Sequence, residues 1–225
     1  MNPPVLSLVV AAFVASCALA ADAPPEKPKR PARPPGQHSY GRHAALADTA
    51  KMTAADGLAV TLFACEPMVV NPCDMDIDER GRVWITEGAN YRISMHTNWG
   101  VIREGGDRIQ IIEDTDGDGV ADKASTFYQD PSINAALGIC VLGNKVIVSS
   151  APNVFVLTDS DGDGKADRRE LLFTDIKGFD HDHAVHAFVF GPDGKLYFNM
   201  GNAGEQLRRP SEALKDIPLH GLIDK

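Results

Sequence analysis

The sequence of 225 residues lacks several features that would point to a simple assignment. It has no basic stripe, because 31 acidic residues outnumber 22 basic ones and the formal net charge is −9. An acidic body repels the phosphate backbone, so we expect no nucleic acid partner. It also has no C-x-x-C pair and no CxxCH motif. A haem is therefore expected only if a CxxCH module follows further along the protein.

Long apolar runs are scarce as well. The run Val5–Ala20 has the length of a signal peptide and is too short to span a bilayer. We expect residues 1–20 to be a signal peptide, residues 21–36 to be a Pro-rich tether, and the protein to be exported to the periplasm or cell surface. Two processing routes remain open. One is cleavage after Ala18-Leu19-Ala20, and the other is lipidation of Cys17, which would make the protein a membrane-anchored lipoprotein.

What the sequence does contain is a repeated acidic segment. Residues 108–128 and 153–173 each run from a β-branched, aromatic stretch into a D-x-D-G-D-G-x-x-D loop, and then into a second apolar stretch. The first aspartates of the two loops, Asp114 and Asp159, are 45 positions apart. A period of roughly 40 to 50 residues with short strands is typical of a β-propeller blade.

Other short segments support a fold made of strands. An Ala-rich segment, Ala44–Ala55, predicts a short helix, and four β-rich runs follow it at residues 60–64, 82–86, 145–149 and 195–199. We expect an all-β fold, a partial β-propeller over residues 37–225. At roughly 40 to 50 residues per blade this span supplies about four blades of a six-bladed propeller, so we expect the chain to be a fragment.

The acidic loops have the spacing of a calcium site. Carboxylates at alternate positions surround a hard cation, a glycine at position 6 permits the sharp turn, and a glutamate at position 12 can close the shell. The second loop fits throughout, with Lys165 contributing its backbone carbonyl; the first has Ser125 in place of the glutamate and should bind more weakly. The predicted ligands are Asp159, Asp161, Asp163, Lys165, Asp167 and Glu170 in the second loop, and Asp114, Asp116, Asp118 and Asp122 in the first.

A histidine-rich segment, Asp180–His183, is the most chemically loaded stretch. If it is extended, His181 and His183 share one face and could bind a metal such as Zn²⁺. The other interpretation is that these are hydrogen-bonded polar residues at the start of a strand.

This segment resembles that of a known group of enzymes. Asp182-His183, followed eight residues later by Gly191-Pro-Asp-Gly-Lys-Leu-Tyr and then by Gly201-Asn202, is similar to the segment that carries the catalytic histidine of soluble quinoprotein glucose and sorbosone dehydrogenases. More widely, residues 63 to 202 resemble the N-terminal propeller domain of the membrane-bound dehydrogenase family, PVC-type exported proteins that often end in a haem-binding CxxCH module. The further shared features are Asn71–Asp76, Gly81–Trp84, Glu87–Arg92, Gly106–Ile109 and both acidic loops.

The resemblance implies an activity. In the sugar dehydrogenases the propeller holds pyrroloquinoline quinone with calcium, and the histidine that matches His183 takes the proton from a substrate hydroxyl. Asp182 belongs to the same motif, and Asn202 stands where those enzymes have the aspartate that orients the base. An amide cannot stabilise an imidazolium by charge, so proton abstraction is expected to be weaker or lost. Cationic groups for the quinone come from later blades in those enzymes, so no cofactor ligand is predicted here.

Two hypotheses follow. The leading one is an exported propeller dehydrogenase that oxidises a sugar or other alcohol with a quinone cofactor and passes electrons to a cytochrome. The competing one is a non-catalytic, calcium-stabilised propeller that binds a carbohydrate or a protein at the cell surface.

Overall fold

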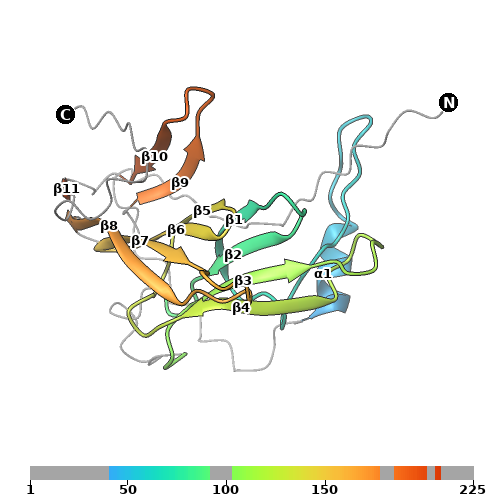
Figure 1. Ribbon diagram of the computed structural model, residues 1–225. Coiled ribbons are helices and arrows are strands. Elements are labelled where there is room, and N and C mark those ends of the chain that lie inside the picture. Colours follow the sequence, from blue (N-terminus) through green and yellow to red (C-terminus); the bar gives the residue numbers. More distant parts are fainter. Residues whose placement is uncertain (1–40, 92–102, 178–184, 202–205, 209–225) are drawn as a thin grey trace, which may run out of the picture. The chain divides into compact units, whose positions relative to one another are not determined.

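The structure is a computed structural model that describes residues 41–91, 103–177, 185–201 and 206–208 (Figure 1). The expected signal peptide and tether lie outside these residues, as do Asp182, His183, Asn202 and most of the insertion after Tyr91. The chain divides into a unit that ends at Met68 and a unit that starts at Val69, and each is described by itself. In the described part of the chain no helix is long and apolar enough to cross a membrane.

The first unit contains the helix α1 (Arg42–Thr49), which overlaps the predicted helix but ends earlier. Backbone bonds from Lys51 N to Asp48 O and from Met52 N to Thr49 O tighten the chain into a turn there. The strand predicted at residues 60–64 was wrong, since this segment is irregular. A strand needs a neighbour for its backbone groups, and the described residues of this unit provide no other strand.

The second unit consists of antiparallel sheets formed from consecutive strands. The first sheet has the order β1 (Pro72–Ile77), β2 (Val83–Glu87), β3 (Arg108–Glu113) and β4 (Lys123–Gln129). The second repeats this arrangement with β5 (Gly138–Leu142), β6 (Lys145–Ser150), β7 (Asn153–Thr158) and β8 (Arg168–Lys177), and β11 (Gln206–Arg208) adds to the outer edge of β8. The third is the hairpin of β9 (Val185–Phe190) and β10 (Leu196–Met200).

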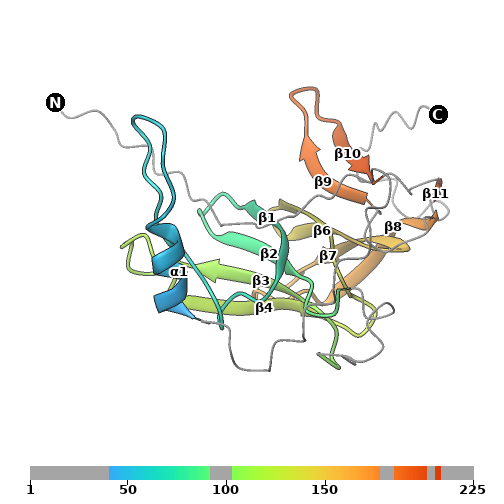
Figure 2. The same cartoon turned by 180° about the vertical axis from the view of Figure 1, so that it is seen from behind.

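These sheets stack face to face, as the blades of a propeller do (Figures 1 and 2). One apolar layer joins the first and second sheets, and another joins the second sheet to the β9–β10 hairpin. The first strands of the three sheets, β1, β5 and β9, are neighbours along one side of the stack. The prediction of an all-β partial propeller is confirmed, with two four-stranded blades and the opening hairpin of a third among the described residues. The layers are built from Trp84, Ile109, Ile111, Phe127, Ile139, Val148 and Leu157, and from Cys140, Val156, Leu172, Phe173, Val185, Phe188 and Leu196.

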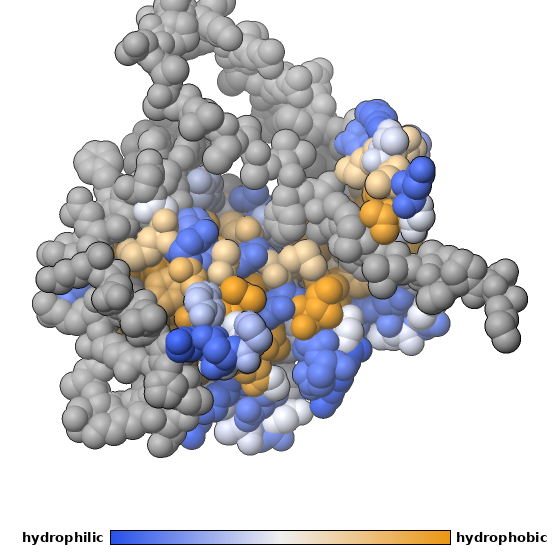
Figure 3. Space-filling view, turned by 90° about the horizontal axis from the view of Figure 1, so that it is seen from above, coloured by the Kyte–Doolittle hydropathy of each residue, from blue (hydrophilic) through white to orange (hydrophobic). Residues whose placement is uncertain are grey.

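We call β1, β5 and β9 the inner strands. Each of them presents a large apolar side chain that the described residues leave exposed, namely Ile77, Leu142 and Val189. The face seen from above in Figure 3 likewise shows apolar residues interspersed with hydrophilic ones. Each of these residues lies at or next to the last residue of its strand, so the cores between the sheets leave that end of the inner strands uncovered.

Two aspartates on β1 join the inner strands of the first two blades. Asp74 accepts hydrogen bonds from Met75 N at 2.9 Å and, across the gap between blades, from Ile139 N at 3.0 Å. Asp76 repeats the pattern with Ile77 N at 2.8 Å and Val141 N at 2.7 Å. Unpaired strand-edge amides are costly when buried, and these carboxylates satisfy amides of both edges at once. We call this arrangement the carboxylate bridge.

A third aspartate, Asp78, organises the turn between β1 and β2. Its carboxylate accepts bonds from Arg80 N, from Arg82 N and Nε, and from Trp84 Nε1 at 2.9 Å. Burial acts to raise the pKa of Asp78, but the hydrogen bonds from Trp84 and Arg82 outweigh it and hold the pKa below its usual range. The turn is therefore stabilised by the ionised form.

The sign of this shift predicts an acid-dependent loss of stability. A lowered carboxyl pKa contributes stability that is complete above the unfolded pKa, near 4, and is lost as the pH falls through the folded value. We expect Asp78→Asn to lower the free energy of unfolding at pH 7 by about 2 kcal/mol, and by clearly less at pH 3. Urea unfolding at both pH values measures this, with the exposed neighbour Glu79→Gln as control. An equal difference at the two pH values would contradict it.

Candidate functional site

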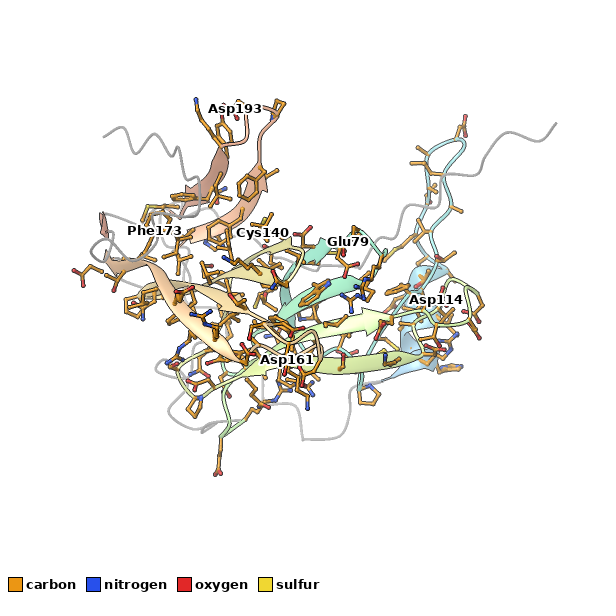
Figure 4. The ribbon with its side chains drawn as sticks, viewed as in Figure 1. Glu79, Asp114, Cys140, Asp161, Phe173 and Asp193 are labelled. Carbon is orange, nitrogen blue, oxygen red and sulfur yellow. The ribbon has the colours of Figure 1, made fainter. Side chains whose placement is uncertain are left out.

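The strand order separates two ends of the blades. Strands β3 and β7 lead into the two acidic loops, residues 114–122 and 159–167, so both loops lie at the same end, which we call the acidic end. The connections β2–β3, β4–β5 and β8–β9 leave from the opposite end, which we call the insertion end. The segment that carries His183 connects β8 to β9 and thus starts and finishes at the insertion end. In Figure 4, Asp114 and Asp161 mark the two acidic loops.

The acidic loops share one backbone geometry. In the first, Asp114 accepts bonds from Gly117 N at 2.8 Å and Gly119 N at 2.8 Å; in the second, the equivalent bonds to Asp159 are 2.7 Å and 2.9 Å. Both glycines of each loop have positive φ, between 79° and 87°, where a Cβ atom would be strained. The D-G-D-G pattern therefore folds the chain around its first aspartate, and glycine is required for that turn.

The first three aspartates of each loop are brought together. Their carboxylate oxygens lie within 4.8 Å of one another, once in Asp114, Asp116 and Asp118 and once in Asp159, Asp161 and Asp163, and each group could hold a metal ion. Oxygen-only ligand sets of this kind suit a hard cation such as Ca²⁺.

The other predicted ligands are placed differently. Asp122 accepts hydrogen bonds from the backbone N and the Oγ1 of Thr115, and Asp167 accepts one from Ser160 Oγ. Each of these aspartates therefore closes the base of its loop. Glu170 lies on β8, opposite Val156 of β7, outside the group of three aspartates. Lys165 donates its backbone N–H to Asp163 at 2.8 Å.

Electrostatics keeps the first aspartate of each loop ionised. The amide of Gly119, and then that of Gly117, lower the pKa of Asp114 below its ordinary value. For Asp159, burial acts to raise the pKa, but bonds from the amides of Gly164 and Gly162 outweigh it and the pKa is again lowered. Both loops thus present carboxylates in the charged form that a cation requires.

At the insertion end, a fully buried glutamate holds two arginines. Glu87 accepts bonds from Arg108 Nε at 2.7 Å and Nη2 at 2.8 Å, from Gln110 Nε2 at 2.8 Å, and from Val70 N at 3.1 Å, and it also pairs with Arg103. Its side chain is 0% exposed, against 21% for Arg103 and 25% for Arg108. The ends of the β2–β3 connection are thereby tied to the first blade.

Asn90 and Asp107 complete this anchor. Asn90 donates its side-chain amide to Arg103 O at 2.8 Å and accepts a bond from Arg103 N at 2.9 Å, much as a paired strand would. Asp107 accepts bonds from Asn90 N and Ala135 N, and its burial, only partly offset by these bonds, raises its pKa. The β2–β3 and β4–β5 connections are therefore held together at their bases.

A further polar group lies on the inner strands, and the sequence patterns did not reveal it. We call it the axial group: Asp74 and Asp76 of β1, Cys140 of β5 and His186 of β9. Burial, followed by repulsion from Asp76 and Asp74, raises the pKa of Cys140 to about 12, so its thiol stays protonated. The one signal in the sequence was the pair of charged residues in an otherwise strand-like run, Asp74-Met75-Asp76, which is unusual for an inner strand.

Comparison with known proteins gives the family. A domain of unknown function, DUF7133, matches residues 46–218, which is most of the chain. The chain belongs to this family. No curated protein matches it. Among solved structures, the holo form of the pyranose dehydrogenase PQQ domain from Coprinopsis cinerea is similar, with 19% identity and a TM-score of 0.42 over 60% of this chain. The chain of this DUF7133 member spans 28% of that protein's length.

The buried glutamate generates a stability prediction. We expect Glu87→Gln to lower the free energy of unfolding by about 3–5 kcal/mol, because it leaves two largely buried guanidinium groups without their countercharge. A matched control is Glu113→Gln, whose partner Lys123 is 57% exposed and whose loss should cost less than about 1 kcal/mol. Urea unfolding of both variants compares them. Losses of equal size would show that Glu87 does not act as the anchor.

Proposed function

We propose that this chain is part of an exported propeller dehydrogenase that oxidises a sugar or other alcohol with a quinone cofactor. The observation that carries the proposal is the position of the β8–β9 connection. This connection contains the Asp182-His183 motif that resembles the quinoprotein sugar dehydrogenases, and it leads directly into the inner strand β9. In propellers the inner strands surround the central channel, so a connection that enters one of them is suited to contact a ligand there.

The proposed reaction separates a proton from a hydride. His183 is the general base and accepts the proton of the substrate hydroxyl, and a bound quinone cofactor would supply the acceptor for the hydride of the adjacent carbon. An imidazole suits this step because its ordinary pKa lies near neutral pH. The related dehydrogenases have an aspartate where this chain has Asn202, and an amide gives the imidazolium of His183 no charged partner. We therefore expect the enzyme to be slow.

The arginines described at the insertion end are not free to hold the quinone itself. Pyrroloquinoline quinone carries carboxylates and needs cationic partners, but the arginines at the insertion end, Arg103 and Arg108, are both engaged by Glu87. We therefore assign no described residue to the cofactor and derive no step from its contacts. When bound, it would serve as the hydride acceptor.

The competing proposal is a non-catalytic propeller that binds a carbohydrate or a protein at the cell surface. Two observations favour it: Asn202 is uncharged, and both arginines of the insertion end are already paired. Ligand binding that survives His183→Ala, without any redox turnover, would support this role.

The catalytic proposal predicts that His183 is essential. In a dye-reduction assay of the full-length protein with pyrroloquinoline quinone, calcium and sugars, His183→Ala should lower kcat by at least about 100-fold, since it removes the general base. His43→Ala, an equivalent change on the exposed face of α1, is the matched control and should leave the rate unchanged. Unchanged activity of His183→Ala would refute the assignment.

We also propose that the acidic loops are structural calcium sites. The three aspartates of each site come from one loop at the acidic end, so a bound cation would stabilise a hairpin rather than take part in chemistry. The sequence favours the second loop as the tighter site, because it has Glu170 at position 12 where the first loop has Ser125. In the structure Glu170 lies on β8 outside the group of three aspartates, so it would have to turn toward the cation to add its oxygens.

Calcium should therefore raise the melting temperature. At a concentration about 100-fold above Kd, one site contributes about 2.7 kcal/mol. Asp159→Ala should remove more of the effect than Asp114→Ala. Asp193→Ala, which changes an exposed aspartate in the β9–β10 turn, is the control and should leave the calcium effect intact. Differential scanning calorimetry with calcium and with a chelator measures this; no shift at millimolar calcium would exclude both sites.

A further inference from the structure

Each sheet of the stack has two faces, and the second strand of the sheet shows which side chains belong to which face. In the first blade, Trp84 of β2 packs into the layer shared with the second blade. In the second blade, Val146 of β6 packs back into that same layer, whereas the next residue, Ile147, packs into the layer shared with the β9–β10 hairpin. Neighbouring residues of a strand point to opposite faces. We call the face toward the following sheet the forward face and the other the backward face.

The forward face of the β9–β10 hairpin is exposed, unlike those of the first two blades. Leu196 of β10 packs backward, so the next residue, Tyr197, points forward, where it pairs with Val189 of β9. The side chains of Tyr197 and Val189 are 49% and 57% exposed. Trp84 and Ile147, at the places equivalent to Tyr197 on β2 and β6, are 2% and 1% exposed. Two forward faces are thus covered by a following sheet, and the described residues leave the third open.

Tyr197 is held in a fixed orientation, as Trp84 is. The Nε1 of Trp84 donates to Asp78 in the turn before β2, at 2.9 Å. The hydroxyl of Tyr197 likewise donates at 2.9 Å to Asp193, which marks the turn before β10 in Figure 4. The ring of Tyr197 also lies close to Gly191, where an added Cβ would come 2.5 Å from its Cε2 atom. A side chain that is already oriented loses little conformational entropy when a partner covers it.

A polar position next to the aromatic residue favours a further sheet as the partner. Ser149, two residues after Ile147 on the forward face of β6, donates its Oγ to the carbonyl of Val185 at 2.6 Å. Val185 is the first residue of the following inner strand, β9. Asn199, two residues after Tyr197, has the equivalent place on β10, is exposed, and carries an amide that can donate in the same way. The open face therefore offers the same two kinds of contact that the second blade uses to hold the next inner strand.

A second copy of the chain lacks the face that would fit. In both described interfaces a forward face packs on a backward face, so a second copy would need a free backward face. The backward face of the first blade carries the residues that alternate with Trp84 and Ile111. These residues, Val83, Ile85 and Ile112, are 6%, 5% and 0% exposed. Among the described residues every backward face is already covered, so the open forward face requires another sheet.

We propose that the forward face of the β9–β10 hairpin, formed by Val189, Tyr197 and Asn199, is the docking face for a fourth blade of the same polypeptide. The occupant is an antiparallel sheet that follows in sequence, because both described interfaces join sheets that are consecutive in sequence. Its second strand presents apolar side chains at the places of Val146 and Leu196, and its inner strand offers a carbonyl to Asn199. Docking places a fourth inner strand beside β9 and so extends the wall around the central channel. This docking does not depend on the proposed dehydrogenase activity.

The first test measures whether the face is covered in the unaltered full-length protein. Hydroxyl-radical footprinting, read by mass spectrometry, reports the solvent access of individual side chains. Tyr197 and Val189 should be oxidised at least about tenfold more slowly in the native protein than in urea, because the radical reaches covered side chains only when the protein opens locally. Leu46 of α1, which is 47% exposed, is the internal control and should slow by less than about threefold.

The footprint also separates the possible occupants of the face. Protection of Tyr197 that does not change with protein concentration supports a blade of the same polypeptide. Protection that is lost on dilution would show that a second copy covers the face, and the proposal would be overturned. Oxidation of Tyr197 at equal rates in the native and the unfolded protein would show an uncovered face and would overturn it as well.

A pair of substitutions tests the same face through stability. Val189→Lys should lower the melting temperature of the full-length protein by at least about 5 °C, because it places an unpaired charge in the interface. Leu46→Lys, at a position of similar exposure, is the matched control and should lower it by less than about 2 °C. Equal shifts in the two variants would contradict the docking face. If Val189→Lys does not fold, the footprint of the unaltered protein decides, since it needs no substitution. A full-length protein without quinone-dependent oxidation would refute the dehydrogenase proposal and leave both results unchanged.

Discussion

The carboxylate bridge is the interaction on which the arrangement of the blades depends. Two sheets that stack face to face bury apolar side chains readily, but their first strands leave backbone amides at an edge where no strand pairs. Asp74 and Asp76 supply the acceptors for β1 and β5 together, at 2.7 to 3.0 Å. Because side chains at i and i+2 point the same way along a strand, the two carboxylates also set the register between the blades.

The two ends of the blades differ in the range of their contacts. At the acidic end each hairpin folds mainly around its own aspartate. The second loop also reaches other strands, because Ala166 N donates to Phe127 O at 2.9 Å and Asn144 Nδ2 donates to Asp159 O at 3.0 Å. At the insertion end the contacts are long-range: Asp107 reaches Ala135, Asn90 reaches Asn134, and Glu87 holds Arg103 and Arg108. Local contacts suit a repeated stabilising element, whereas long-range contacts fix the bases of connections that come from different strands. A ligand site built from several blades needs the second kind of support.

Local patterns predicted the parts of the structure that local physics determines. Turn chemistry and the alternation of apolar and polar residues predicted the D-G-D-G loops, the strands β2, β6 and β10 after glycine turns, and the blade-like period. The structure contains all of them. The segment 60–64 has strand-like residues but no partner strand, and the sequence alone could not show this. The axial group was also missed, because Asp74, Cys140 and His186 are far apart along the chain. Their proximity arises from the stacking of blades, which no local pattern in the sequence reveals.

The pairing of β11 with β8 has a consequence for how the third hairpin is retained. The chain leaves β8 at its last residue, Lys177, and forms β9 and β10. It then returns to β8, where Gln206 of β11 pairs with Lys177. The hairpin is thus tethered to the second blade at both of its ends. If its apolar face separates from the second layer, it remains at a high effective concentration and redocks as an intramolecular event. Strand β11 therefore shortens the time that the β9–β10 hairpin spends undocked. Its effect is on the rate of redocking rather than on the area of buried surface.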